Sequence, residues 1–309
     1  MRLAGLGTRM AMGRTAKGQG RTALGYLFAA PLLFVLAIAI LLPAGYNTVV
    51  AFFRYNATRD TWRYTGFDNF VELFASDAFW NSFAVTLIWV SGNVALQLVV
   101  GFWVALALNR IVRFRGAFSA VLLIPWVSSF VVVAVLFLWI YHPQLGVLND
   151  LLLKLGLVER PVAWLSSPEL AQLSLILANS WKFFPLVMIT LFTGLQDVPG
   201  EVLEAAEIDG ASRFQTLVRI VVPLLAPSIA TAVLLSTIWG YNSFTLPIIM
   251  TAGGPLGSTE IMGLYIYKLA FDAFDFGGAA AASLVLFVQI LVVVALYLRF
   301  ADRELAPSA

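Results

Sequence analysis

The chain has 309 residues, of which 61% are hydrophobic and only 12% are charged. A soluble domain usually has about twice that charged fraction, so the composition excludes an ordinary soluble domain. A net charge of +2 gives no indication of a nucleic-acid partner, and the absence of cysteine excludes disulfides and thiolate metal sites. Because His142 is the only histidine, we expect no metal site.

Residues 1–22 are polar, glycine-rich and basic, without an acidic residue. They predict a disordered cytoplasmic tail beside an anionic membrane leaflet. A signal peptide is the alternative, but the apolar run that follows is too long for one, so we interpret this run as an uncleaved first span. Residues 303–309 predict a second, short cytoplasmic tail.

Six apolar runs within residues 23–302 are each long enough to cross a hydrocarbon layer of about 30 Å as a helix. They predict an all-α polytopic membrane protein with six transmembrane helices. The predicted spans are Tyr26–Phe53, Asn81–Leu108, Phe118–Tyr141, Leu170–Leu195, Leu224–Met250 and Gly277–Phe300. The polar stretch between the first two spans is predicted to be a loop.

An even number of spans places both termini on the same side of the membrane. With the loops assigned alternately, about twelve Lys and Arg residues lie on the side of the termini and about six on the other. Because basic segments tend to stay in the cytoplasm, we expect both termini to be cytoplasmic. The segment between the fourth and fifth spans, residues 196–223, is then cytoplasmic as well.

Lys182 lies about eleven residues into the fourth predicted span, where a charge costs on the order of 3 kcal/mol. Its ammonium therefore needs a partner. One interpretation is a donor to a hydroxylated or anionic ligand in a cavity, and the other is a structural ion pair or hydrogen bonds to carbonyls of a partner subunit. Asn179 lies one turn earlier on the same helical face. The residues alone leave both interpretations open.

In the fifth predicted span, Ser236, Trp239, Gly240 and Ser243 recur at positions i, i+3, i+4 and i+7, on one face of a helix. Aromatic rings can stack on the C–H faces of sugars, while small polar groups orient hydroxyls. Small residues also favour close helix packing. From this stripe alone, helix packing is the favoured interpretation.

The stretch from Glu204 to Pro223 reads EAAEIDGASRFQTLVRIVVP. Helix formers precede Gly210, a second helix-forming run follows it, and a proline closes the stretch. This order predicts two short helices that meet at Gly210, because a residue without a side chain allows a sharp turn. The charged side chains of the stretch require contact with water or with a protein partner.

This stretch resembles the EAA loop of the membrane subunits of bacterial ABC importers, with Val222 where leucine is usual. In that family the loop forms coupling helices that dock into a groove of a cytoplasmic ATPase. The resemblance therefore implies an ATPase-coupling role for Glu204, Ala205, Ala206, Asp209, Gly210, Ile220 and Pro223.

The likeness extends from about residue 24 to about residue 300 and includes Leu123-Ile124-Pro125-Trp126, Asn179-Ser180-Trp181-Lys182 and Gly253-Gly254-Pro255. The chain resembles the MalF-type half of a carbohydrate importer, related also to the glycerol-phosphate type. This implies a type I ABC importer permease fold in a bacterial inner membrane. In the maltose-type permease, sugar is contacted at the positions that match Asn179, Lys182, Phe183, Leu186, Ser236, Trp239, Gly240 and Ser243.

The resemblance implies the transmembrane subunit of an ATP-driven sugar importer, with an oligosaccharide as the expected substrate. The implied partners are a homologous second permease (MalG-like), two copies of an ABC ATPase and an extracytoplasmic solute-binding protein. The sequence contains no G-x-x-x-x-G-K-[ST] phosphate loop, so we expect the ATPase, and not this chain, to bind ATP and magnesium. The chain itself is expected to bind no cofactor and to be no enzyme.

Two alternatives remain. One is an ABC permease for glycerol-phosphate or another non-sugar solute. The other is a secondary carrier with Lys182 as its coupling charge. Such carriers often have inverted repeats and membrane carboxylates, whereas this sequence has no clear repeat and no acid deep in a predicted span.

Overall fold

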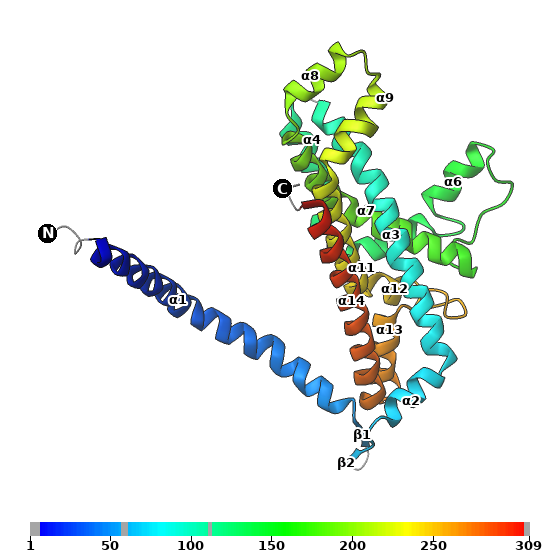
Figure 1. Ribbon diagram of the computed structural model, residues 1–309. Helices are drawn as coiled ribbons and strands as arrows, with labels where there is room; N and C mark the ends of the chain where they lie inside the picture. The colour runs from blue at the N-terminus through cyan, green and yellow to red at the C-terminus, as the bar shows by residue number, and fades with distance from the viewer. Residues whose placement is uncertain (1–6, 57–60, 111–112, 306–309) are drawn as a thin grey trace, which may run out of the picture.

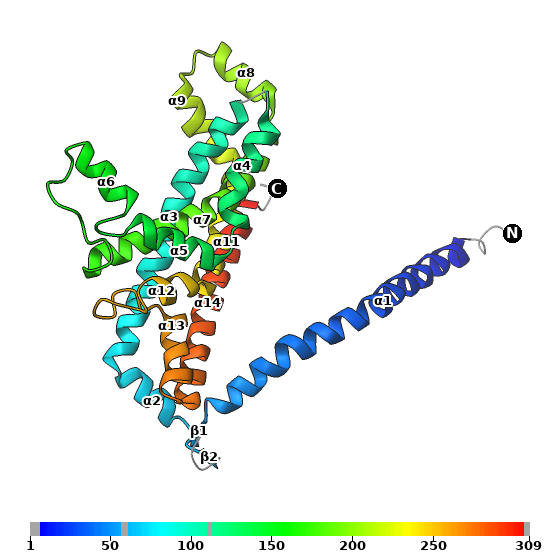
Figure 2. The same cartoon turned by 180° about the vertical axis from the view of Figure 1, so that it is seen from behind.

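The computed structural model describes residues 7–56, 61–110 and 113–305. Within these ranges the chain is helical apart from its connecting turns and one two-stranded hairpin. Two opposite views show an elongated bundle of helices from which one long helix, α1 (Gly7–Val50), diverges (Figure 1, Figure 2). The helical fold class is thus confirmed, and the hairpin is an addition that the sequence did not predict.

Four helices contain a stretch long and apolar enough to cross a membrane: α1, α3 (Asp77–Arg110), α7 (Pro168–Gln196) and α14 (Phe276–Leu305). Two further candidates are bent. Helices α4 (Arg115–Val127) and α5 (Phe130–Ile140) meet at 91°, and the segment Arg213–Leu224 meets α11 (Ala226–Asn242) at 66°. With each bent pair counted as one span, the total equals the six that the sequence predicts.

The bend between α4 and α5 and the early end of α11 have local causes. Ser128 and Ser129 separate α4 from α5 in extended conformation, and serine pairs are common sites of sharp helix kinks. The fifth predicted span ends early, because α11 stops at Asn242 and a separate helix, α12 (Thr245–Met250), follows. Pro247 explains this stop, since it cannot donate to the carbonyl of Ser243 and its ring would clash there.

The predicted disordered tail is wrong for residues 7–22, because α1 begins at Gly7. This stretch has no proline and contains Ala, Met, Arg, Lys and Gln, which favour helices. At the other end, α14 continues to Leu305 through the first residues of the predicted second tail. Residues 1–6 and 306–309 of the two predicted tails lie outside the described residues.

The hairpin and α2 (Asp68–Ala75) occupy the predicted loop after the first span. Strand β1 (Phe53–Asn56) pairs antiparallel with β2 (Thr61–Tyr64), and aromatic residues suit such strands. The buried side chain of Asn69 donates to the carbonyls of Ala51 at 2.8 Å and Phe53 at 3.0 Å. These bonds tie α2 to the end of α1 and to β1.

The remaining short helices lie in the connections: α6 (Val147–Lys154), α8 (Gly200–Ile208), α9 (Arg213–Thr216), η1 (Leu217–Val221), α10 (Val222–Leu224), α13 (Met262–Tyr267) and η2 (Lys268–Asp272). Helices α8 and α9 lie at one end of the molecule, and the hairpin lies at the opposite end (Figure 1, Figure 2). The C-terminal end of α14 points toward the end with α8 and α9.

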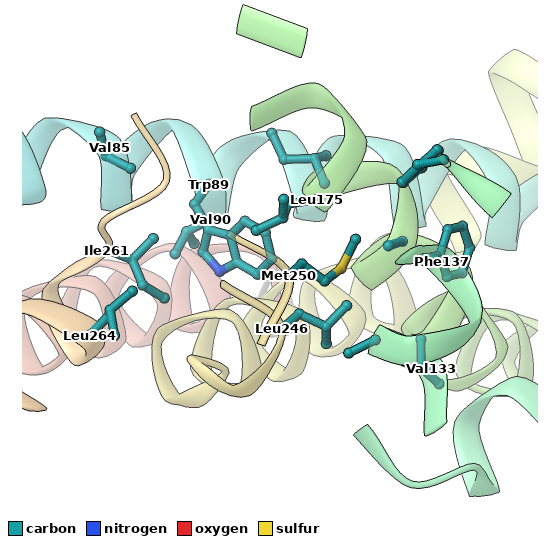
Figure 3. Packing of buried hydrophobic residues seen from close by; sticks show 14 of the residues in the cluster. Val85, Trp89, Val90, Val133, Phe137, Leu175, Leu246, Met250, Ile261 and Leu264 are labelled. Atoms are coloured by element: carbon teal, nitrogen blue, oxygen red, sulfur yellow. The ribbon is translucent and has the colours of Figure 1, made fainter. Parts of the chain in front are cut away.

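The centre of the bundle is the packing of α3 along α7, with α5, α11 and α12 against them. Figure 3 shows the buried cluster, in which Trp89 of α3 lies beside Leu246 and Met250 of α12 and Leu175 of α7. The indole nitrogen of Trp89 donates to the carbonyl of Gly240 at 3.1 Å. The core therefore surrounds the break between α11 and α12.

Gly101 permits the close approach of α3 to α7. A Cβ at this position would lie 2.7 Å from Cγ1 of Val187 and 3.0 Å from the backbone nitrogen of Met188. We therefore expect Gly101→Ala to destabilise the protein by about 1–3 kcal/mol, as overpacking does, measured by thermal unfolding in detergent. The matched control is Gly116→Ala in α4, where nothing lies within 4 Å. Equal melting temperatures of the two variants would contradict the expectation.

Candidate functional site: an exposed elbow and a buried polar network

Helices α8 and α9 form an exposed turn that we call the elbow, residues 200–216. At its apex Gly210 has φ +75°, in the left-handed region that favours glycine. The amide of Gly210 donates to the carbonyl of Glu207 at 3.1 Å, and that of Ala211 to Ala206 at 3.0 Å. These two bonds are the Schellman ending of an α-helix. The prediction of two short helices meeting at Gly210 is confirmed.

The second helix of the elbow starts with a capping box. The Ser212 hydroxyl accepts from the Gln215 amide at 3.3 Å, and the Gln215 side-chain oxygen accepts from the Ser212 amide at 2.8 Å. The sequence DGASRFQ thus contains both the end of one helix and the start of the next. We did not predict this cap, although the Ser-x-x-Gln pattern would have indicated it.

The predicted coupling residues differ in exposure. Ala206 is buried and Ile220 is half-buried, whereas the others, Glu204, Ala205, Asp209, Gly210 and Pro223, are exposed. Two large apolar side chains of the elbow, Ile208 and Phe214, are exposed as well. A protruding surface that is both charged and apolar suits a protein partner. The coupling role of these residues stays a prediction.

Gly194, in the last turn of α7, allows the ends of α7 and α11 to approach each other beside the elbow. A side chain there would collide with Ser228 and crowd Leu225, at the start of α11. The ends of α7 and α11 are therefore in close contact on the two sides of the elbow. A displacement of the elbow would reach both helices directly.

Lys182 lies at the middle of α7 and is 3% exposed. Its ammonium donates to the carbonyl of Trp126 at 3.1 Å and to that of Ser128. It also lies 4.5 Å from the centre of the Phe130 ring, within the range of a cation–π contact. Among the ion pairs of the described residues, none involves Lys182. The carbonyls that hold Lys182 belong to its own chain, at the break between α4 and α5.

A buried polar network joins α3, α7 and the end of α11. The side-chain oxygen of Asn93 accepts from Asn179 at 2.8 Å, from Ser180 at 3.1 Å and from Gln97 at 3.4 Å. Asn179 in turn accepts from the Ser243 hydroxyl at 3.3 Å. The structure thus brings together Asn179 and Ser243, two of the predicted substrate contacts. Asn93 and Gln97 were missed, although two amides four residues apart in an apolar span indicate a polar face.

Asn93 is the centre of this network, so its replacement leaves three donors without their acceptor. We expect Asn93→Leu to destabilise the protein by about 1–2 kcal/mol, since hydrogen bonds between membrane helices are worth up to about that much. Ser91→Ala is the control, because the exposed Ser91 hydroxyl bonds only to the backbone of its own helix. Thermal unfolding of both variants in detergent measures the difference. A loss as small as that of the control would contradict a stabilising network.

The predicted stripe of α11 has two environments. Ser236 and Gly240 are buried, and no hydrogen-bond partner of the Ser236 hydroxyl lies among the described residues. Trp239 is 41% exposed, and its ring centre lies 5.3 Å from that of the buried Phe183. Leu186, one turn beyond Lys182, is half-buried. Contact of any of these residues with a substrate stays a prediction.

The chain thus combines up to six apolar spans with a protruding helical elbow between α7 and α11. The family model described as "Binding-protein-dependent transport system inner membrane component" matches residues 97–305, which include the elbow and every member of the polar network except Asn93. The chain belongs to this family. Its resemblance to the permeases of ABC importers is thereby confirmed.

Two relatives and one solved structure resemble the chain over most of its length. It is 33% identical to the trehalose/maltose transport system permease protein MalF of Thermococcus litoralis over 89% of this chain and 92% of the relative. It is 32% identical to the sulfoquinovosyl glycerol transport system permease protein SmoG of Agrobacterium fabrum over 91% of each chain. A chain in the crystal structure of a bacterial alginate ABC transporter, in complex with alginate pentasaccharide-bound periplasmic protein, matches with a TM-score of 0.77 and 25% identity, over 93% of this chain and 96% of that chain.

Proposed function

We propose that this permease is the transmembrane subunit of an ATP-driven sugar importer and forms half of its translocation pathway. The observation that carries the proposal is the elbow, whose turn at Gly210 presents exposed charges beside the ends of α7 and α11. The sequence has no phosphate loop, so a separate ATPase would bind ATP and magnesium. The elbow is the surface that we propose this ATPase contacts. The names of the relatives support a sugar, with an oligosaccharide as the proposed substrate.

The proposed assembly contains a homologous second permease, two ATPase subunits and a periplasmic solute-binding protein. The complex of the alginate transporter with its periplasmic protein supports the last of these. None of the most apolar stretch of α1, within Phe28–Val50, is buried inside the chain. We propose that lipid and the second permease cover it. The termini and the elbow are proposed to face the cytoplasm of a bacterial cell.

The proposed substrate region lies where the middle of α7 meets the C-terminal part of α11. The exposed ring of Trp239, which lies against Phe183, offers an apolar face on which a sugar ring can stack, and Leu186 lies one turn beyond Lys182 on α7. The other predicted contact residues lie on α7, on α11 or directly after α11: Asn179, Lys182, Ser236, Gly240 and Ser243. Lys182 already contacts two carbonyls, so we propose that it supports this region from behind.

Transport by the reconstituted complex tests the proposal. The chain, its second permease and its ATPase are placed in proteoliposomes with the solute-binding protein and the sugar that co-purifies with it. We expect sugar uptake only with ATP and only with the complete complex. Uptake by this chain alone without ATP would favour a secondary carrier. Uptake of glycerol-phosphate, and of no sugar, would favour the non-sugar permease.

A further inference from the structure

A groove of about 830 Å³ lies between the last turns of α3 and the elbow. The large apolar side chains of its lining include Trp103 and Leu106 of α3 and Phe214 of α9. The charged side chains of its lining are Arg110, Arg213 and Glu207. We call this cavity the interfacial groove. Its size is in the range of pockets that hold small molecules, about 300–1,000 Å³.

The groove lies at the depth of a membrane surface. Asn93 and Lys182 mark the middle of α3 and of α7, and the buried polar network lies at the same level. Trp103 follows Asn93 by ten residues, or about 15 Å of helix, which is half of the ~30 Å hydrocarbon thickness. Arg110 lies about 10 Å further, at the level of lipid headgroups. Tryptophan is common at this boundary, and Trp103 is exposed.

The charges of the groove favour an anion. In the part of the chain that the structure describes, neither Arg110 nor Arg213 forms an ion pair. Arg110 lines the groove from α3 and Arg213 from α9, and guanidinium groups can bind a phosphate through paired hydrogen bonds. With the single carboxylate of Glu207, the lining keeps one positive charge. A headgroup with net charge −1 neutralises this net charge, whereas a zwitterionic headgroup leaves it uncompensated.

We propose that the interfacial groove binds an anionic glycerophospholipid of the phosphatidylglycerol type. Arg110 and Arg213 bind its phosphate, Glu207 accepts from the hydroxyls of its glycerol headgroup, and the start of an acyl chain lies against Trp103 and Leu106. Basic pockets beside membrane helices on the cytoplasmic side bind such headgroups. The inference rests on the proposed function for the cytoplasmic position of the elbow. A lipid in this place would contact the elbow and α3 at once, so its binding would bias the position of the elbow.

The test is native mass spectrometry of the purified full-length chain with equal amounts of phosphatidylglycerol, phosphatidylethanolamine and phosphatidylcholine. We expect retention of phosphatidylglycerol. The double variant Arg110→Gln/Arg213→Gln should weaken this retention by about 30-fold, which corresponds to about 1 kcal/mol per guanidinium. The matched control removes two exposed charges elsewhere, Arg63→Gln/Arg160→Gln, and should retain the lipid as the wild type does.

Glu207→Gln keeps an oxygen acceptor for the headgroup hydroxyls but removes the negative charge from the lining. It should therefore strengthen binding of phosphatidylglycerol by a few-fold, a result that misfolding cannot imitate. Equal retention of the three lipids, or an unchanged preference in the double variant, would overturn the proposal. So would cross-linking from position 214 in the whole transporter to the ATPase or the second permease instead of to lipid. Lipid retention is measured without ATP or sugar, so its failure is distinguishable from a failure of the proposed transport.

Discussion

Replacing Gly210 by valine is expected to lower ATP-driven uptake by about tenfold or more while the chain still inserts into the membrane. Gly210 has φ +75°, and no atom lies within 4 Å of the place where its side chain would be. The obstacle is therefore the backbone conformation and not lack of space. A left-handed conformation costs a residue with a side chain about 1–2 kcal/mol, and each 1.4 kcal/mol is a factor of ten in population. A β-branched residue is an outlier there.

The matched control for this prediction is Gly210→Asn. Asparagine adds a side chain of similar size to valine but tolerates the left-handed region, and it also ends helices in nature. We expect uptake by this variant to stay within a few-fold of the wild type. The amount of each variant in the membrane, and its copurification with the ATPase, are measured in parallel. Equal uptake by the valine and asparagine variants, at equal assembly, would show that the geometry of the turn does not matter for transport.

The elbow could be predicted from the sequence because its signals are local. A glycine ends α8, and the residues that cap α9 lie within the next five positions. The four straight spans could be predicted for a similar reason, since length and hydrophobicity suffice to identify them. Each of these features depends on residues that are close together along the chain.

The breaks and the polar network could not be predicted in the same way. Hydropathy alone does not distinguish a straight helix from α4 and α5, which meet at 91° within one apolar run. The partners of Asn179 depend on which helix packs beside α7, and Asn93 lies 86 residues away in sequence. The same holds for Lys182, whose acceptors lie in the last turn of α4 and at the residue that follows it, which only the folded bundle places beside α7.

The contacts of Lys182 explain how a lysine can be stable at the centre of a membrane helix. The break after Val127 leaves the last carbonyls of α4 without intrahelical partners, and in a bilayer such groups cost several kcal/mol each. The C-terminal end of a helix also carries partial negative charge. The ammonium supplies both donors and opposite charge, and the carbonyls in turn solvate the ammonium. The ammonium and the carbonyls therefore each lower the free-energy cost of burying the other.

We therefore expect Lys182→Met to destabilise the protein by about 2–4 kcal/mol, because carbonyls at the break lose a charged donor. The thermal midpoint in detergent should fall by roughly 5–10 °C. Lys182→Arg should recover part of this loss, since a guanidinium keeps the charge and the donors. The control is Lys154→Met, at an exposed pair with Asp150, which should change stability by less than about 0.5 kcal/mol.

Kinetics separates this structural role from direct contact with the sugar. If Lys182 stabilises the break between α4 and α5, less of the Lys182→Met variant should be folded. The fraction that still assembles should need the same sugar concentration for half-maximal uptake as the wild type. If Lys182 instead binds the sugar, stability should be unchanged while the half-saturating concentration rises about tenfold or more, as expected for a lost charged hydrogen bond. An unchanged melting temperature would therefore refute the structural role, whatever the uptake. The geometry favours the first outcome, because the ammonium already donates to two carbonyls and faces an aromatic ring.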